Sequence, residues 1–119
     1  MMAQLVVQPA AKQYFKKLND KRLEQLIKEA MEAILADPSI GEMKHSDLRG
    51  IQCVDIYHNK TNYELAYLVV EIDNEAEQSS MTSSEAPRPN TSETVVVVIL
   101  AGTRENFYRE LKRYWKLMS

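Results

Sequence analysis

Apolar residues recur at helical spacing through the first third of the chain. One run places four of them at positions i, i+3, i+4 and i+7, on one face of a helix: Ala11, Tyr14, Phe15 and Leu18. A second run continues this spacing from Leu23 to Leu35. Asp20 is a good N-cap for the second run, and the dipeptide Asp37-Pro38 ends it. The pattern predicts two helices, and the short break between them indicates an antiparallel helical hairpin.

The spacing changes in the second half of the chain, where several segments are rich in β-branched and aromatic residues. Residues 51–57 and 63–72 flank a polar turn and predict two strands. Residues 94–100 are apolar at successive positions, which suits a central strand covered on both faces. A short apolar segment at residues 5–7 predicts one further strand. Residues 104–118 return to helical spacing and predict a basic amphipathic helix.

These elements follow one another in the order β-α-α-β-β-β-α. The order predicts an α+β fold, in which the N-terminal helical hairpin packs on a small, mostly antiparallel sheet. A chain of 119 residues has the size of one domain with one hydrophobic core. We therefore expect residues 1–119 to form a single domain.

Composition excludes several classes of protein. The single cysteine, Cys53, excludes an internal disulfide and a multi-thiolate zinc site, and two histidines are too few for a typical catalytic zinc site. The longest apolar run, residues 95–101, is far shorter than the roughly 18 to 20 residues that span a bilayer. We expect a cytoplasmic protein that uses no metal and no cofactor.

An acidic, polar segment interrupts the pattern at residues 73–93. It holds five acidic residues and one arginine, and the rest of the chain holds 14 basic and 12 acidic residues. The segment cannot bury much apolar surface, so we expect a flexible insertion. Two interpretations stay open: a tolerated surface loop, or an acidic segment that folds back on the basic residues around Arg104 and Lys112.

Two parts of the chain carry candidate binding or catalytic residues. The loop 41–50 contains Lys44, His45 and Arg49 between two glycines, ahead of a strand. Lysine and arginine can hold a phosphate, and histidine can move a proton near neutral pH. Arg104 and Tyr108 are spaced i, i+4 at the start of the last helix, so both side chains point to one side of it. The alternatives are a polar surface loop and an ordinary helix with an apolar face.

Three motifs, taken in order, resemble the RelE/ParE superfamily of bacterial toxins from type II toxin–antitoxin modules. They are Leu48-x-Gly50, Tyr63-x-x-x-Tyr67, and the run from Gly102 to Tyr108. The resemblance extends from about Gln4 to Trp115, with the acidic segment as an interruption. It implies the element order predicted above, and a cytoplasmic toxin that a small antitoxin protein holds inactive.

The superfamily contains two activities. The resemblance implies either a metal-independent endoribonuclease that cuts mRNA on the ribosome, or an inhibitor of DNA gyrase that lacks the nuclease residues. For a nuclease, the resemblance implies roles for Arg104 and Tyr108, and for Lys44 with His45 beside it. We accordingly expect Arg104, Tyr108 and His45 to be catalytic, and we expect Lys44, together with the basic residues Arg49 and Lys112, to bind RNA.

One position departs from the nuclease pattern. Where the superfamily commonly has an arginine after the first tyrosine of the second motif, this chain has Glu64. A carboxylate there would repel the scissile phosphate or else serve as a base. Our leading hypothesis is a ribosome-dependent mRNA endonuclease. The alternative is a ParE-like gyrase inhibitor or a catalytically inactive homologue that only binds its antitoxin.

Overall fold

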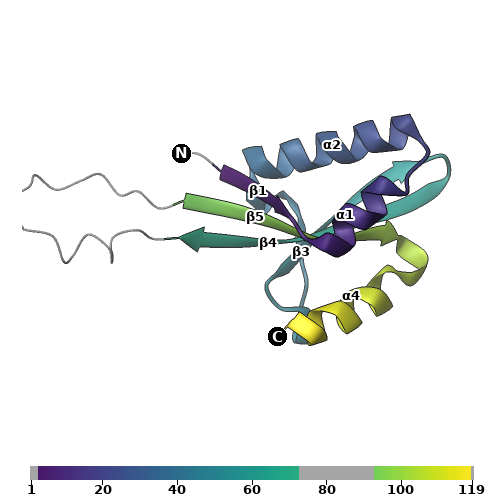
Figure 1. Ribbon diagram of the computed structural model, residues 1–119. Coiled ribbons are helices and arrows are strands. Elements are labelled where there is room, and N and C mark those ends of the chain that lie inside the picture. Colours follow the sequence, from purple (N-terminus) through teal and green to yellow (C-terminus); the bar gives the residue numbers. More distant parts are fainter. Residues whose placement is uncertain (1–2, 73–92, 119) are drawn as a thin grey trace, which may run out of the picture.

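The computed structural model describes residues 3–72 and 93–118, which form one five-stranded sheet with helices on both faces (Figure 1). Its elements are β1 (Ala3–Val7), α1 (Pro9–Lys16), α2 (Lys21–Ala36), the 3-10 turn η1 (Pro38–Ile40), β2 (Glu42–Met43), the 3-10 turn η2 (Ser46–Leu48), β3 (Ile51–His58), β4 (Thr61–Ile72), β5 (Glu93–Thr103) and α4 (Arg104–Met118). The predicted α+β class and the predicted order of the main elements are confirmed.

The strands lie in the order β1-β5-β4-β3-β2. Only β1 and β5 pair in parallel, and the other three pairs are antiparallel. β5 is an interior strand and is mostly buried, as its apolar sequence predicts. The short edge strand β2 was not predicted, because two residues are too few to show a strand period in the sequence.

Opposite faces of the sheet carry different helices. Ala11 of α1 and Ile34 of α2 are fully buried in one cluster, together with Leu65 and Tyr67 of β4. Ala66 lies between these two β4 residues in the sequence, faces the other side of the sheet, and belongs to the cluster beneath α4. Figure 1 shows the same division, with α1 and α2 on one side of the strands and α4 on the other. Both helices of the predicted hairpin therefore pack on the sheet, while their packing against each other stays a prediction.

Two apolar side chains anchor α4 to the sheet. Phe107 and Leu111 are at most 1% exposed and pack against Ile51 and Cys53 of β3, among others. Burying each such side chain stabilises the fold by roughly 1.5 to 3 kcal/mol. The spacing of these two residues leaves Arg104 and Tyr108 on the side of α4 that faces the ends of β4 and β5.

The predicted acidic insertion lies almost entirely outside the described residues. Its last residue, Glu93, is described and begins β5, so the strand starts one residue earlier than predicted. β4 and β5 are neighbouring antiparallel strands, and the segment therefore joins two strands that pair with each other. Among the described helices, none is long and apolar enough to cross a membrane.

Candidate functional site

Three of the predicted site residues meet around the side chain of Glu64. The hydroxyl of Tyr108 donates a hydrogen bond to Glu64 Oε1 at 3.1 Å, and Arg104 Nε lies 3.7 Å from Glu64 Oε2. Lys44 Nζ lies 4.8 Å from the centre of the Tyr108 ring, in cation–π geometry. Lysine, arginine and tyrosine, predicted from two distant parts of the sequence, thus share one site with a carboxylate at its centre.

The strands and α4 bring these side chains together. Glu64 lies on β4, where it pairs with Asp55 of β3 on one side and with Gly102 of β5 on the other. α4 begins at Arg104, directly after β5. Arg104 is two residues beyond Gly102, which is the β5 partner of Glu64. One helical turn later, Tyr108 lies on the same side of α4.

Tyr67 holds the segment that carries Lys44. Its buried hydroxyl lies 2.7 Å from the carbonyl oxygen of Pro38 and accepts a hydrogen bond from the backbone N–H of Gly41 at 2.9 Å. The segment then continues into β2, and the N–H of Lys44 donates to the carbonyl of Ile51 at 2.9 Å. The second tyrosine of the sequence motif is therefore a structural residue that positions the lysine.

Glu64 is a buried carboxylate with incomplete hydrogen bonding. Its side chain is 2% exposed, and Oε2 is buried without a hydrogen-bond partner among the described residues. Burial raises the pKa of Glu64, and the neighbouring Asp55 raises it further, while Tyr108 and Lys44 act in the opposite direction. The proton is therefore held more tightly here than on an ordinary glutamate.

The two cations of the site are already paired with carboxylates. Lys44 donates to Glu42 Oε1 at 3.1 Å, and Arg104 lies beside Glu64. Burial lowers the pKa of Lys44, but Tyr108 and Glu42 raise it by more, so the lysine stays protonated. Burial also raises the pKa of the Tyr108 phenol, which remains a neutral hydrogen-bond donor. The site therefore holds the two cations Lys44 and Arg104 and three carboxylates, which are those of Glu42, Glu64 and Asp55.

The other predicted site residues are exposed and separate from this cluster. They are His45, Arg49 and Lys112. His45 precedes η2 without a side-chain capping bond, and Lys112 lies one turn beyond Tyr108 on α4. No hydrogen bond or ion pair between described residues connects any of the three to Glu64. Their assignment as a catalytic or RNA-binding set stays a prediction.

Sequence reasoning missed Asp55 and Glu42 as members of the site. Asp55 becomes a neighbour of Glu64 only through the register of β3 and β4. Glu42 lies two residues before Lys44, on the same side of an extended segment, which is the signal that could have identified it.

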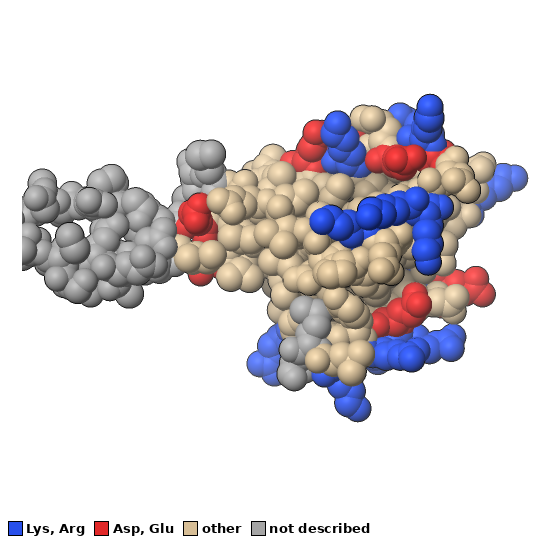
Figure 2. Space-filling model, in the orientation of Figure 1, with Lys and Arg blue, Asp and Glu red and all other residues tan. Residues whose placement is uncertain are grey.

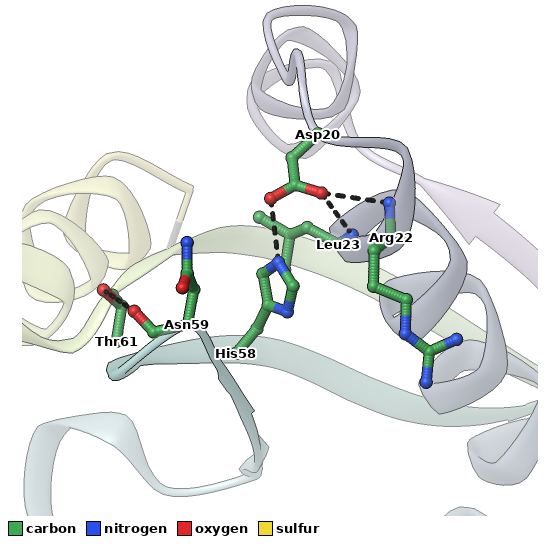
Figure 3. Close-up of polar contacts among 6 residues, drawn as sticks. All are labelled: Asp20, Arg22, Leu23, His58, Asn59 and Thr61. Atoms are coloured by element: carbon green, nitrogen blue, oxygen red, sulfur yellow. Dashed lines mark hydrogen bonds and ion pairs between the residues drawn. The ribbon is translucent and has the colours of Figure 1, made fainter.

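A second polar contact joins the turn between β3 and β4 to the start of α2 (Figure 3). Asp20 accepts hydrogen bonds from the N–H groups of Arg22 and Leu23, which confirms it as an N-cap. Its other oxygen lies 2.8 Å from His58 Nε2. The contact with His58, and then the bond from Leu23, lower the pKa of Asp20. No group of three or more potential metal ligands occurs within residues 3–72 and 93–118.

Comparisons with known proteins agree with this fold. A family model described as "ParE-like toxin of type II bacterial toxin-antitoxin system" matches residues 5–86. A chain from the crystal structure of the intact E. coli RelBE toxin–antitoxin complex is similar in fold, with a TM-score of 0.53 and 22% sequence identity. This similarity covers 86% of the present chain and 96% of the other. No curated protein sequence matches the chain.

Proposed function

Because the chain belongs to the family of ParE-like toxins of type II bacterial toxin–antitoxin systems, we propose that it inhibits DNA gyrase by binding it and does not cut RNA. One observation carries this choice between the two activities. The buried carboxylate of Glu64 engages both Arg104 and Tyr108, the two residues that a nuclease would need for its reaction.

RNA cleavage without a metal requires fixed cations around the phosphorane, and each such donor contributes about 3 kcal/mol. A phosphate about 4 Å from an ionised Glu64 would instead be repelled by about 4 kcal/mol at an effective dielectric constant of about 20. The repulsion is as large as the contribution expected from Arg104. A phosphate-binding site at this position therefore has little net attraction for its ligand.

A surface that binds a protein has no such requirement. Its charges can be paired, because apolar contact and hydrogen bonds supply most of the affinity. The paired charges of Lys44 and Arg104 favour this kind of surface. As a member of a toxin–antitoxin family, the chain also has a cognate antitoxin as partner. The exposed edges of β1 and β2 are the places where a strand of that antitoxin would add to the sheet.

The second candidate function is the ribosome-dependent mRNA endonuclease. The raised pKa of Glu64 supports it, because a carboxylate with a raised pKa is a suitable general base near neutral pH. In this mechanism Glu64 would take the 2'-hydroxyl proton, and Arg104 would turn from the carboxylate toward the phosphate.

Two assays on the same purified protein separate the functions: inhibition of gyrase supercoiling, and primer extension on translated mRNA. We expect inhibition of gyrase and no codon-bounded cuts. The variant Arg104→Ala/Tyr108→Phe should keep at least about half of the toxicity of the parent on expression. Arg109→Ala/Tyr114→Phe, with the same changes elsewhere on α4, is the matched control. Cuts that disappear in the first variant and persist in the control would establish the endonuclease instead. Failure of both activities would leave an inert antitoxin-binding homologue.

A further inference from the structure

Six exposed cations gather where α1 meets α2, on the face of the sheet opposite α4. Five lie in the stretch 12–22, and the sixth lies in the turn between β3 and β4. We call this set the basic junction; its members are Lys12, Lys16, Lys17, Lys21, Arg22 and Lys60. Figure 2 shows lysine and arginine side chains across the part of the surface where α1 lies in Figure 1.

The contact between Asp20 and His58 makes this a single surface. The two side chains are 2.8 Å apart, so the turn that carries Lys60 lies beside the loop that joins the two helices (Figure 3). Two carboxylates lie close to these cations in the sequence, one within residues 12–22 and one two residues beyond. One is Asp20, which already accepts two backbone hydrogen bonds and the histidine contact, and the other is Glu24 in the first turn of α2.

The cations of the basic junction differ from those of the candidate site. None of the six forms an ion pair with an acidic side chain in the described part of the chain, whereas Lys44 and Arg104 each lie beside a glutamate. An unpaired, exposed cation can bind a phosphate without first breaking an ion pair. Each such contact also releases a counterion from the nucleic acid, which favours binding.

We propose that the basic junction binds the phosphodiester backbone of duplex DNA. The choice of duplex DNA rests on the proposed function, because gyrase acts on DNA and a protein bound to it meets that DNA. The spacing is suitable: Lys12 and Lys16 are about 6 Å apart along the helix axis. Successive phosphates of one strand are about 3.4 Å apart along the duplex axis and farther apart through space because they wind around it, so two lysines one helical turn apart can each reach one of two neighbouring phosphates. Contacts to the backbone alone make the binding independent of base sequence.

Fluorescence anisotropy with a short labelled duplex, in the absence of gyrase, tests the site directly. The variant Lys12→Gln/Lys16→Gln removes two cations one turn apart on α1. Arg109→Gln/Arg113→Gln removes two exposed cations with the same spacing on α4 and is the matched control. Circular dichroism spectra of both variants serve to check that they are folded.

The α1 variant should bind the duplex about tenfold more weakly at 0.1 M salt, and the slope of log K against log salt should fall by about 2. The α4 control should change affinity by less than about threefold. Equal losses in the two variants would overturn the proposal, because they would reflect net charge rather than a localised surface. Binding of a single-stranded RNA that is as tight and as sensitive to the α1 change would also overturn it.

A supercoiling assay with the same variants distinguishes this inference from the proposed function. Weaker gyrase inhibition by the α1 variant and unchanged inhibition by the control are expected. If the parent protein inhibits gyrase and the α1 variant binds duplex DNA as the parent does, the inference alone fails. If the parent binds duplex DNA through α1 and leaves gyrase active, the proposed function alone fails.

Discussion

Replacement of Glu64 by glutamine is expected to stabilise the protein at neutral pH. The carboxylate is buried in the sheet, one of its oxygens has no hydrogen-bond partner within residues 3–72 and 93–118, and Asp55 on the next strand raises the cost of ionising it. A glutamine of nearly the same shape can still accept the hydrogen bond from Tyr108. Its amide group also offers donors where the carboxylate has none.

The size of the effect follows from two opposing contributions. An unsatisfied buried polar atom costs about 1 to 3 kcal/mol, which the substitution removes in part. The substitution also loses the ion pair with Arg104, whose side chain is 61% exposed and whose Nε lies 3.7 Å away. Such an exposed pair contributes about 0 to 1 kcal/mol. We expect a net gain of about 1 kcal/mol at pH 7, or an increase of about 4 °C in the melting temperature.

The gain should depend on pH. Because burial and then Asp55 raise the pKa of Glu64, the folded state binds its proton more tightly than the unfolded chain does. The stability that comes from this proton is fully present below the unfolded pKa of about 4.3, and it is lost as the pH rises through the higher folded pKa. Glutamine does not titrate. The advantage of Glu64→Gln should therefore be largest at neutral pH and should shrink as the pH falls toward about 4.

Urea denaturation of the parent and the variant at several pH values measures this difference. Glu32→Gln, which changes an exposed glutamate on α2, is the control and should show no comparable gain. A loss of more than about 1 kcal/mol in Glu64→Gln at pH 7 would refute the reasoning, because it would mean that the pair with Arg104 outweighs the cost of the buried charge.

Two further predictions concern the scaffold. Asp20→Ala should lower the melting temperature more than Asp20→Asn, which keeps a capping oxygen. The contacts with His58 and Leu23 lower the pKa of Asp20, so the stability that its ionised form contributes is present above the unfolded pKa of about 3.9. Thermal melts of the parent and of Asp20→Ala should therefore converge as the pH falls below this value. Gly41→Ala should lower the free energy of unfolding, measured by urea denaturation, by about 1 to 3 kcal/mol, because the new Cβ would lie 2.9 Å from Cε1 of the buried Tyr67. An unchanged urea midpoint would show that the η1–β2 segment can move to make room for the methyl group.

The order of the main elements could be predicted because each depends on local spacing. The helical period around Ala11 and Leu23, and the successive apolar residues of β5, were visible in the sequence and correspond to buried positions. The position of each strand in the sheet was not visible. The parallel pairing of β1 with β5 is a contact between residues about 90 positions apart, and no local pattern specifies it.

The candidate site was predictable in its residue types and not in its electrostatics. Arg104 and Tyr108 share a helix face, so their proximity followed from their spacing, and the basic residues of the loop 41–50 singled out Lys44 as a candidate binding residue. The pairing of Lys44 with Glu42 and of Arg104 with Glu64 depends on the β-sheet register and on the docking of α4. Both are tertiary features, and they decide whether the cations are available to a ligand.

The candidate site and the basic junction both contain lysine and arginine, so composition alone does not distinguish them. They differ in whether these cations are already paired with a carboxylate. At the candidate site, a phosphate would have to compete with Glu42 and Glu64 for the lysine and the arginine. At the basic junction, Lys12 and Lys16 are exposed and form no ion pair within the described ranges 3–72 and 93–118. Because a cation that is already neutralised contributes little to phosphate affinity, any binding of nucleic acid by this toxin should depend on α1 more than on the start of α4. Comparing the salt dependence of Lys12→Gln with that of Arg104→Gln, each of which removes one cation, tests this ranking, and a larger loss of slope in the second variant would reverse it.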